Sequence, residues 1–137
     1  MSTAKVTYLG NLRTECKHLK SGSTYFTDAP TDNNGKGEAF SPTDTVATGL
    51  ANCMLTMMGI KSRDLSVSLD GSVASVTKTM TANPRRISRI DVVMDLPENV
   101  DTRSRKILEK TALTCPVMYS LHPTIHKEVF FNWILKG

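Results

Sequence analysis

The sequence predicts an α+β fold with mainly antiparallel sheets. Residues 4–28 consist of short strand-like runs separated by turn signals, and a well-marked helix start follows at residue 41. Later in the chain, a second helical stretch leads into an alternating segment over residues 125–135. The expected order is three strands, a helix, three strands, a helix and a strand. A length of 137 residues fits one core, so we expect a single domain over residues 1–137.

The first three strands are predicted by the turns between them. Gly10-Asn11 and Ser21-Gly22 are turn signals, and each separates two runs rich in strand-forming residues. The third run, residues 24–27, ends at Asp28-Ala29-Pro30. Residues 31–40 are polar and contain two glycines, which indicates a loop. The N-terminal part is therefore expected to be a β meander.

The first helix has the clearest start signal in the chain. Ser41 suits the N-cap, Pro42 suits the first helical position, and Asp44 stands where a capping box needs an acid. Lys61 near the predicted end, at about residue 61 or 62, matches the helix dipole.

The apolar side chains of this helix recur at a spacing of four, three, four and three residues. They are Val46, Leu50, Cys53, Met57 and Ile60. That spacing predicts one buried stripe and places Cys53 on it.

The second half of the chain alternates strand and helix signals. Residues 65–80 are strand-type residues around a turn at Asp70-Gly71, and Asn83-Pro84 breaks the pattern. A strand is expected over residues 87–97. A helix then opens at Asp101 and restarts at Cys115-Pro116, before the closing or edge strand of residues 125–135.

Composition excludes several classes of protein. No run of about 18 apolar residues is present, so we expect no membrane span, and the first residues do not have the apolar stretch of a signal peptide. A cytoplasmic location follows as an expectation. The net charge is +4, but few aromatic residues lie near the basic cluster of residues 85–89. We therefore expect a solvated surface or a patch for an anionic partner, and no nucleic-acid site.

Three cysteines carry the most chemical information. An odd number, Cys16, Cys53 and Cys115, argues against a structural disulfide framework, and the sequence has no Cys-x-x-Cys pair. Cys16 and His18 share a strand face, but two potential ligands do not make a structural zinc site. We expect neither a metal nor a cofactor.

Two of these cysteines have contrasting local settings. Pro116 fits the first position of a helix, so Cys115 would be its N-cap, where free N–H groups lower a thiol pKa. A capping residue without redox chemistry is the alternative. A cysteine on an apolar helical stripe, such as Cys53, is more often an inert core residue.

The segments around both cysteines resemble one known family. Phe40-Ser-Pro-Thr-Asp44 followed by Gly49-Leu-Ala-Asn-Cys53 is similar to the first cysteine helix of the osmotically inducible protein C (OsmC) and organic hydroperoxide resistance (Ohr) family. Thr114-Cys-Pro-Val117 followed by Leu121 resembles the second cysteine motif. Residues 83–91 resemble the strand pair between them. The match runs in order over nearly the whole chain and indicates the OsmC-like subgroup.

This resemblance implies a thiol peroxidase for organic hydroperoxides, built as an intertwined homodimer. Cys53 would attack the peroxide and become a sulfenic acid, and Cys115 would resolve it as a disulfide. A dithiol reductant, for example a lipoyl-type compound, would then reduce this disulfide. Local sequence favours Cys115 as the more acidic thiol, whereas the resemblance makes Cys53 the attacking one, and we follow the resemblance. The alternative is a family fold kept as a binding module for a small anionic or acyl ligand.

The resemblance also implies a cation beside the attacking thiol. The family uses an arginine of the N-terminal meander, and Arg13 is the only arginine before the first cysteine motif. Asp44 is the acid expected to orient it, with Glu15 as the second choice. Two departures from the family pattern are Thr43, where many members have glutamate, and Met118, where they often have histidine.

Overall fold

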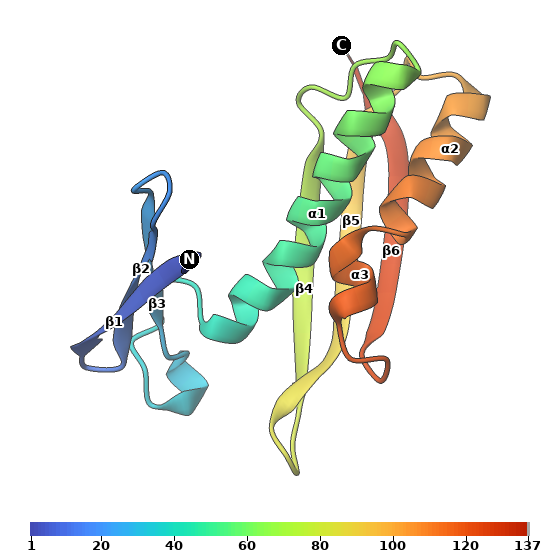
Figure 1. The fold of residues 1–137 in the computed structure, drawn as a ribbon. Helices are drawn as coiled ribbons and strands as arrows, with labels where there is room; N and C mark the ends of the chain where they lie inside the picture. Colours follow the sequence, from blue (N-terminus) through green and yellow to red (C-terminus); the bar gives the residue numbers. More distant parts are fainter. Residues whose placement is uncertain (137) are drawn as a thin grey trace. The chain divides into compact units, whose positions relative to one another are not determined.

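The computed structural model describes residues 1–136 and confirms the α+β class. Its elements, labelled in Figure 1, are β1 (Ala4–Gly10), β2 (Arg13–His18), β3 (Thr24–Asp28), a 3-10 turn η1 (Thr31–Asn33), α1 (Pro42–Asp64), β4 (Val73–Thr81), β5 (Arg86–Pro97), α2 (Thr102–Leu113), α3 (Pro116–Ser120) and β6 (His126–Leu135). The chain divides into two compact units, Met1–Val46 and a second that begins at Ala47. Each unit is described by itself.

The first unit contains the predicted β meander. Strands β1, β2 and β3 form an antiparallel sheet in chain order. In its register Cys16 lies opposite Val6 on one side and Tyr25 on the other, and Arg13 lies opposite Asp28. Two positions of the β1–β2 turn, Asn11 and Leu12, have positive φ, which fits the turn expected at Gly10-Asn11.

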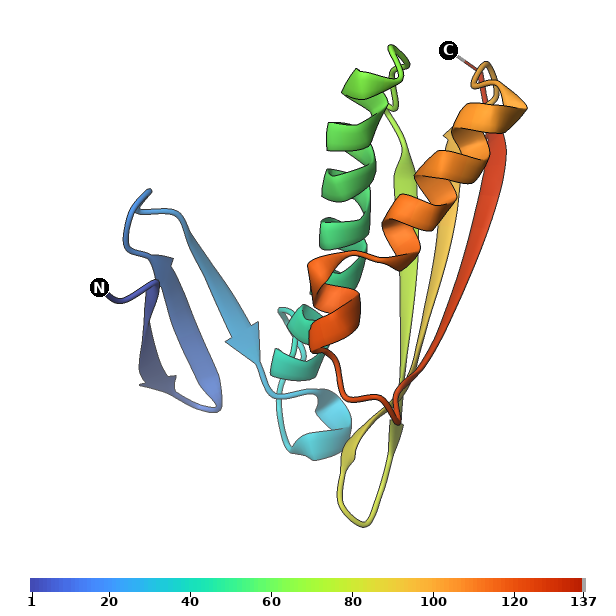
Figure 2. The ribbon, with the colours of Figure 1, turned by 45° about the vertical axis from the view of Figure 1, so that its right-hand side comes forward.

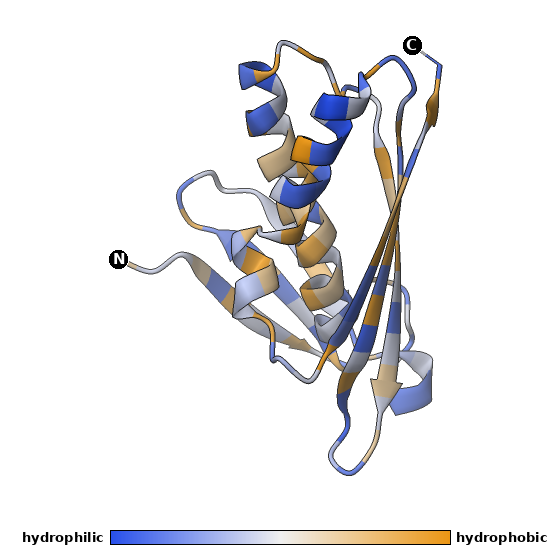
Figure 3. Ribbon diagram, turned by 90° about the vertical axis from the view of Figure 1, so that its right-hand side faces the viewer, coloured by the Kyte–Doolittle hydropathy of each residue, from blue (hydrophilic) through white to orange (hydrophobic). Residues whose placement is uncertain are grey.

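The second unit is a three-stranded sheet covered by helices. The strand order is β4-β5-β6, and α1, α2 and α3 lie over the same face of this sheet (Figures 1 and 2). Strands β4 and β5 pair antiparallel, whereas β5 and β6 pair parallel. A parallel pair needs a long crossover connection, and α2 and α3 supply it. The strands alternate hydrophilic and hydrophobic residues in Figure 3, as expected for a sheet with one covered face.

The core of this unit lies between the helices and β5. Its fully buried side chains include Leu50, Met54 and Met58 of α1, Ile90, Met94 and Leu96 of β5, and Leu108 of α2. Cys115, between α2 and α3, is also fully buried. The buried residues of α1, β5 and α2 belong to one cluster, so these elements form a continuous apolar interior.

Residues 65–72 differ from the prediction. We expected a strand before Asp70-Gly71, but these residues form turns and irregular structure. Helix α1 continues to Asp64, past the predicted end, and the chain then folds back on it, because the Val67 N–H donates to the Ser62 carbonyl. The turn at Asp70-Gly71 is present, with Gly71 at a φ of +86°. The second half consequently has one strand fewer than predicted.

The buried stripe of α1 also differs from the prediction. Ala47, Ala51, Met54 and Met58 are buried, with Leu50 shared between the predicted and the observed stripe. Val46 and Ile60, which we expected to be buried, are 44% and 56% exposed. The predicted 4-3-4 spacing of the buried residues is confirmed, but the buried stripe is shifted by one residue along the sequence. As a result Cys53 lies at the border of the buried face and is half-buried.

No helix within residues 1–136 is both long enough and apolar enough to cross a membrane.

Candidate functional site

The second unit brings Cys53 and Cys115 together. Helix α1 positions Cys53, which packs against the edge of the core, and Cys115 is the N-cap of α3. Both cysteines are free thiols, and the Cys53 thiol is close enough to Cys115 to raise its pKa. Residues 62 positions apart in the sequence thus form one pair, in which Cys53 is the more accessible member.

The acidity of Cys115 is opposite to the local prediction. Burial raises the pKa of the Cys115 thiol above its ordinary value, and the neighbouring Cys53 thiol raises it further. The backbone N–H groups of Met118 and Val117 act in the predicted direction and lower the pKa, but burial outweighs them. Helix α3 has only five residues. The N-cap position was predicted correctly, but the low pKa inferred from it was wrong, because the sequence does not show burial.

In the first unit, Arg13 is held by Asp28. The guanidinium donates from Nε to Oδ1 and from Nη2 to Oδ2, each at 2.8 Å, and it lies over the Phe26 ring at 5.4 Å from the centroid. These hydrogen bonds lower the pKa of Asp28 and raise that of Arg13, while burial opposes both shifts. The paired acid is therefore Asp28 and not Asp44 or Glu15, which corrects the sequence prediction.

Sequence reasoning missed Asp28, although the signal was present. Arg13 opens β2 and Asp28 closes β3, so the two are cross-strand partners in an antiparallel hairpin. The register follows from the length of the turn between the strands. Counting back from that turn pairs Arg13 with Asp28.

Asp44 forms the predicted capping box. The Ser41 N–H donates to Oδ2 of Asp44 at 2.9 Å, and the Asp44 N–H donates to Oγ of Ser41 at 3.1 Å. This reciprocal pair satisfies two N–H groups at the start of α1.

The third cysteine belongs to the meander sheet. Cys16 is 9% exposed, and its sulfur lies 3.9 Å from Oγ1 of Thr14. A side-chain hydrogen bond with Cys16 raises the pKa of Tyr25, and burial adds to the shift. Among residues 1–136, no group of three or more histidine, cysteine, aspartate or glutamate side chains is placed to hold a metal ion.

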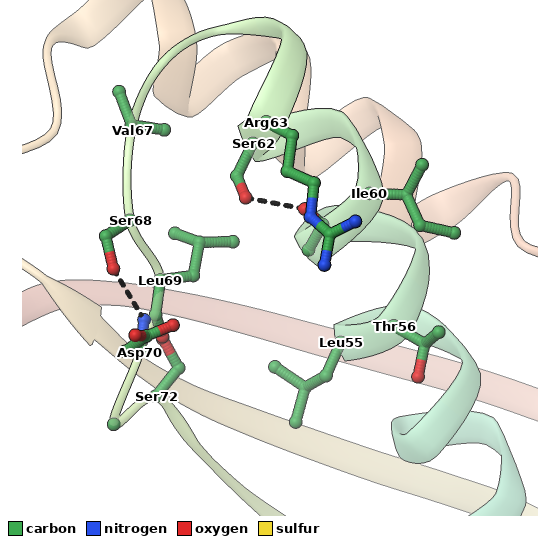
Figure 4. Close-up of a pocket in the computed structure, with 12 residues that line it drawn as sticks. Leu55, Thr56, Ile60, Ser62, Arg63, Val67, Ser68, Leu69, Asp70 and Ser72 are labelled. Carbon is green, nitrogen blue, oxygen red and sulfur yellow. Dashed lines mark hydrogen bonds between the residues drawn. The ribbon is translucent and has the colours of Figure 1, made fainter.

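A groove of about 510 Å³ lies between the C-terminal half of α1 and the segment of residues 67–72 (Figure 4). Leu55, Ile60 and Leu69 contribute apolar surface, and Arg63 and Asp70 contribute charge. The hydroxyls drawn there are used locally: Ser62 donates to the Gly59 carbonyl, and Ser68 accepts from the Asp70 N–H. None of the three cysteines lines this groove, so it is separate from the thiol pair.

By its fold and its site, the protein is an α+β protein with one cysteine on α1 and a second at the N-cap of α3. The chain belongs to the OsmC family, because the model of the OsmC-like proteins matches residues 35–129. The comparison with curated proteins finds no relative of this chain.

Solved structures agree with this family. A protein from Psychrobacter arcticus 273-4, assigned to the osmotic stress induced and detoxification response, is 52% identical, with 96% of each chain covered and a TM-score of 0.93. The organic hydroperoxide resistance protein OsmC of Legionella pneumophila is 15% identical, with 96% of each chain covered and a TM-score of 0.75. An OsmC-like protein of Mycoplasma pneumoniae is 14% identical over 98% of this chain and 96% of its own, with a TM-score of 0.76. The last two similarities show the fold alone.

Proposed function

We propose that this chain is a cysteine-based peroxidase that reduces organic hydroperoxides, works as a homodimer and acts in the cytoplasm. The observation that carries the proposal is the interaction of two free thiols, Cys53 and Cys115, in a member of the OsmC family. Three free cysteines also fit a reducing compartment.

Cys53 is the attacking thiol in this proposal. Its thiolate attacks one peroxide oxygen, the O–O bond breaks, and the other oxygen leaves with a proton as an alcohol, so Cys53 becomes a sulfenic acid. The exposures of the two thiols support this assignment, since Cys53 is half-buried and Cys115 is fully buried. The raised pKa of Cys115 disfavours its thiolate, which also supports Cys53 as the attacking thiol.

Cys115 is the resolving thiol. Its sulfur attacks the Cys53 sulfur, the S–O bond breaks, and the hydroxyl group leaves with the Cys115 proton as water. The resulting disulfide is reopened by a dithiol, which supplies two electrons and two protons and is itself oxidised to a disulfide. A lipoyl-type dithiol is one reductant of this class.

Arg13 is the cation of this proposal. A guanidinium placed near the attacking sulfur would stabilise the negative charge of the thiolate. The pair with Asp28 holds the Arg13 side chain in a single orientation, which suits such a role. The acid that keeps Arg13 in place would then be Asp28, and Asp44 would serve the start of α1.

Peroxide titration tests the proposal. One equivalent of cumene hydroperoxide should consume two thiols and yield a linked Cys53–Cys115 peptide by mass spectrometry. Cys53→Ser should abolish turnover with dithiothreitol, and Cys115→Ser should leave a sulfenic acid that dimedone traps. Cys16→Ser is the matched control and should turn over at the wild-type rate.

The alternative reading is a binding module for a small anionic or acyl ligand. The groove beside α1, with apolar side chains around Arg63, is the observation that favours it. If both thiols survive excess peroxide, or if Cys53→Ser still consumes it, the peroxidase assignment is wrong and the binding module takes its place.

A further inference from the structure

The net positive charge of the chain resides in its second unit. Residues 1–46 carry five Lys and Arg against five Asp and Glu, whereas residues 47–137 carry twelve against eight. The excess of four therefore belongs to the unit that contains the thiol pair. An excess of one sign on one body attracts partners of the opposite sign.

Helix α2 gathers three of these cations on its outer face. Arg103, Lys106 and Lys110 are exposed and lie three and four residues apart, which places them on one stripe. This stripe is opposite the buried residues Leu108 and Ala112. Within the part of the chain that the structure describes, none of the three cations takes part in an ion pair.

The other charged residues of α2 and its N-cap residue make contacts within the second unit. Arg105 donates to the carbonyls of Glu98 and Val100 and lies 5.5 Å from the centroid of the Trp133 ring. Glu109 accepts a hydrogen bond of 2.8 Å from Nε1 of Trp133. Asp101 caps the helix through the Ser104 N–H, and Arg103 helps to lower its pKa. The exposed charged residues of α2 are therefore all cations.

Exposed apolar side chains follow the cationic stripe in the segments on either side of Cys115. Leu113 continues the stripe one turn beyond Lys110 and is 44% exposed. Tyr119 of α3 is 75% exposed. These two residues stand on either side of Cys115 in the sequence, two positions before it and four after it. Together with Arg103, Lys106 and Lys110 they form what we call the α2 surface.

We propose that the α2 surface docks an acidic protein that carries the dithiol reductant. This inference rests on the proposed function, because it assigns a partner to the disulfide that the peroxidase cycle leaves. The partner's acidic residues would face the three cations, and its dithiol would lie over Leu113 and Tyr119, where α2 ends and α3 begins. One partner thiolate attacks the disulfide, and its second thiol closes the partner's own disulfide, which returns Cys53 and Cys115 to thiols.

The chemistry of the surface favours a protein over a nucleic acid. Single-stranded nucleic acids are bound by several aromatic side chains that stack on successive bases, and Tyr119 is the single aromatic residue of this surface. Apolar side chains next to charges are typical of protein interfaces, where charge sets the rate and the choice of partner.

Two synthetic dithiols test the inference. One is a Cys-Gly-Pro-Cys peptide flanked by four glutamates, and the other is the same peptide flanked by four glutamines. With the full-length protein and cumene hydroperoxide, the acidic peptide should have a kcat/KM about tenfold higher at low salt. The advantage should shrink as ionic strength rises.

Charge-reversed variants locate the effect. Lys106→Glu combined with Lys110→Glu should remove the preference for the acidic peptide and leave turnover with the uncharged dithiothreitol unchanged. Lys5→Glu combined with Lys20→Glu makes the same change in net charge on exposed residues of the meander, and it should keep most of the preference.

The outcomes separate the two proposals. If the wild-type protein does not turn over with dithiothreitol, the peroxidase assignment fails and the docking inference fails with it. If dithiothreitol supports turnover but both peptides react equally, or if both charge-reversed variants lose the preference to the same extent, only the docking inference is overturned. Retention of labelled single-stranded RNA by the α2 surface, without a preference for the acidic peptide, would also overturn it.

Discussion

The carboxylate of Asp28 binds the guanidinium of Arg13 through two hydrogen bonds of 2.8 Å across the β2–β3 pair. The arginine uses Nε–H and one N–H of Nη2 in this contact, so three of its five N–H groups remain for other acceptors. Phe26 lies against the guanidinium and restricts it further. The two hydrogen bonds and the ring contact thus restrict the orientation of the Arg13 guanidinium.

Replacing Asp28 tests whether this orientation matters for the proposed peroxidase. Asp28→Asn keeps one acceptor but loses the charge and the two-point contact, so we expect kcat/KM for cumene hydroperoxide to fall roughly tenfold. Steady-state kinetics with dithiothreitol, together with the pH dependence of Cys53 alkylation, measure the effect. Glu15→Gln changes the second acid that the sequence suggests as a partner of Arg13, and this variant should behave like wild type. Loss of activity in Glu15→Gln but not in Asp28→Asn would reverse the assignment.

The same pair makes stability depend on pH. The pKa of Asp28 is lowered in the folded protein, below an unfolded value of about 3.9. A lowered carboxyl pKa stabilises the fold above the unfolded pKa, and this contribution is lost as the pH falls through the folded pKa. We therefore expect the wild-type protein to exceed Asp28→Asn in urea midpoint at pH 6 and this difference to shrink towards pH 3. A constant difference over that range would show that the ion pair contributes nothing.

The two thiols should differ in alkylation rate. Burial raises the pKa of Cys115 and also restricts the access of reagents to it. Iodoacetamide at pH 7 should therefore label Cys53 about tenfold faster than Cys115. In Cys53→Ser, the labelling of Cys115 should rise with pH above about pH 8.5, the ordinary pKa of a thiol, because burial raises the pKa of Cys115. Peptide mass spectrometry over time gives both rates. Faster labelling of Cys115 at pH 7 would restore the helix N-cap argument.

Much of the fold could be predicted because its signals are local. The turns of the meander, the capping box at Ser41 and the restart at Pro116 each depend on neighbouring residues, and all three are observed. The strand expected before Asp70 is absent because α1 extends two to three residues past its predicted end, and the following residues form the return from the helix. Strand propensity yields to such tertiary context.

The candidate site was predictable only in part. Cys53 and Cys115 were paired by resemblance, and no spacing rule joins residues so far apart in sequence. The predicted stripe of α1 has the right period, but Leu50 fits both possible registers, and the apolar side chains alone do not distinguish them. The pKa of Cys115 depends on its burial in the core cluster, which the segment around Pro116 does not encode.

The capping box of α1 can be separated from any role of Asp44 in catalysis. Ser41→Ala removes the hydroxyl that accepts from the Asp44 N–H, and we expect a loss of about 1 kcal/mol in the free energy of unfolding. Urea unfolding measures it. Ser120→Ala, at an exposed position of α3, is the control and should stay within about 0.5 kcal/mol of wild type. If Ser41→Ala keeps full peroxide turnover while losing stability, the box serves the helix alone.

The observed register of α1 leads to a final prediction about the core. Leu50 is fully buried, whereas Asn52, two residues further along the helix, is exposed. Leu50→Ala should cost roughly 2–5 kcal/mol of unfolding free energy, because the cavity adds to the lost transfer energy. Asn52→Ala is the matched control on the same helix, and we expect a change within about 0.5 kcal/mol. Chemical denaturation measures both variants.

A second pair of variants, Met54→Ala and Met57→Ala, distinguishes the observed register of α1 from the predicted one. In the observed register Met54 is fully buried and Met57 only half-buried, so Met54→Ala should be the more destabilising. A larger loss for Met57→Ala would favour the stripe first read from the sequence.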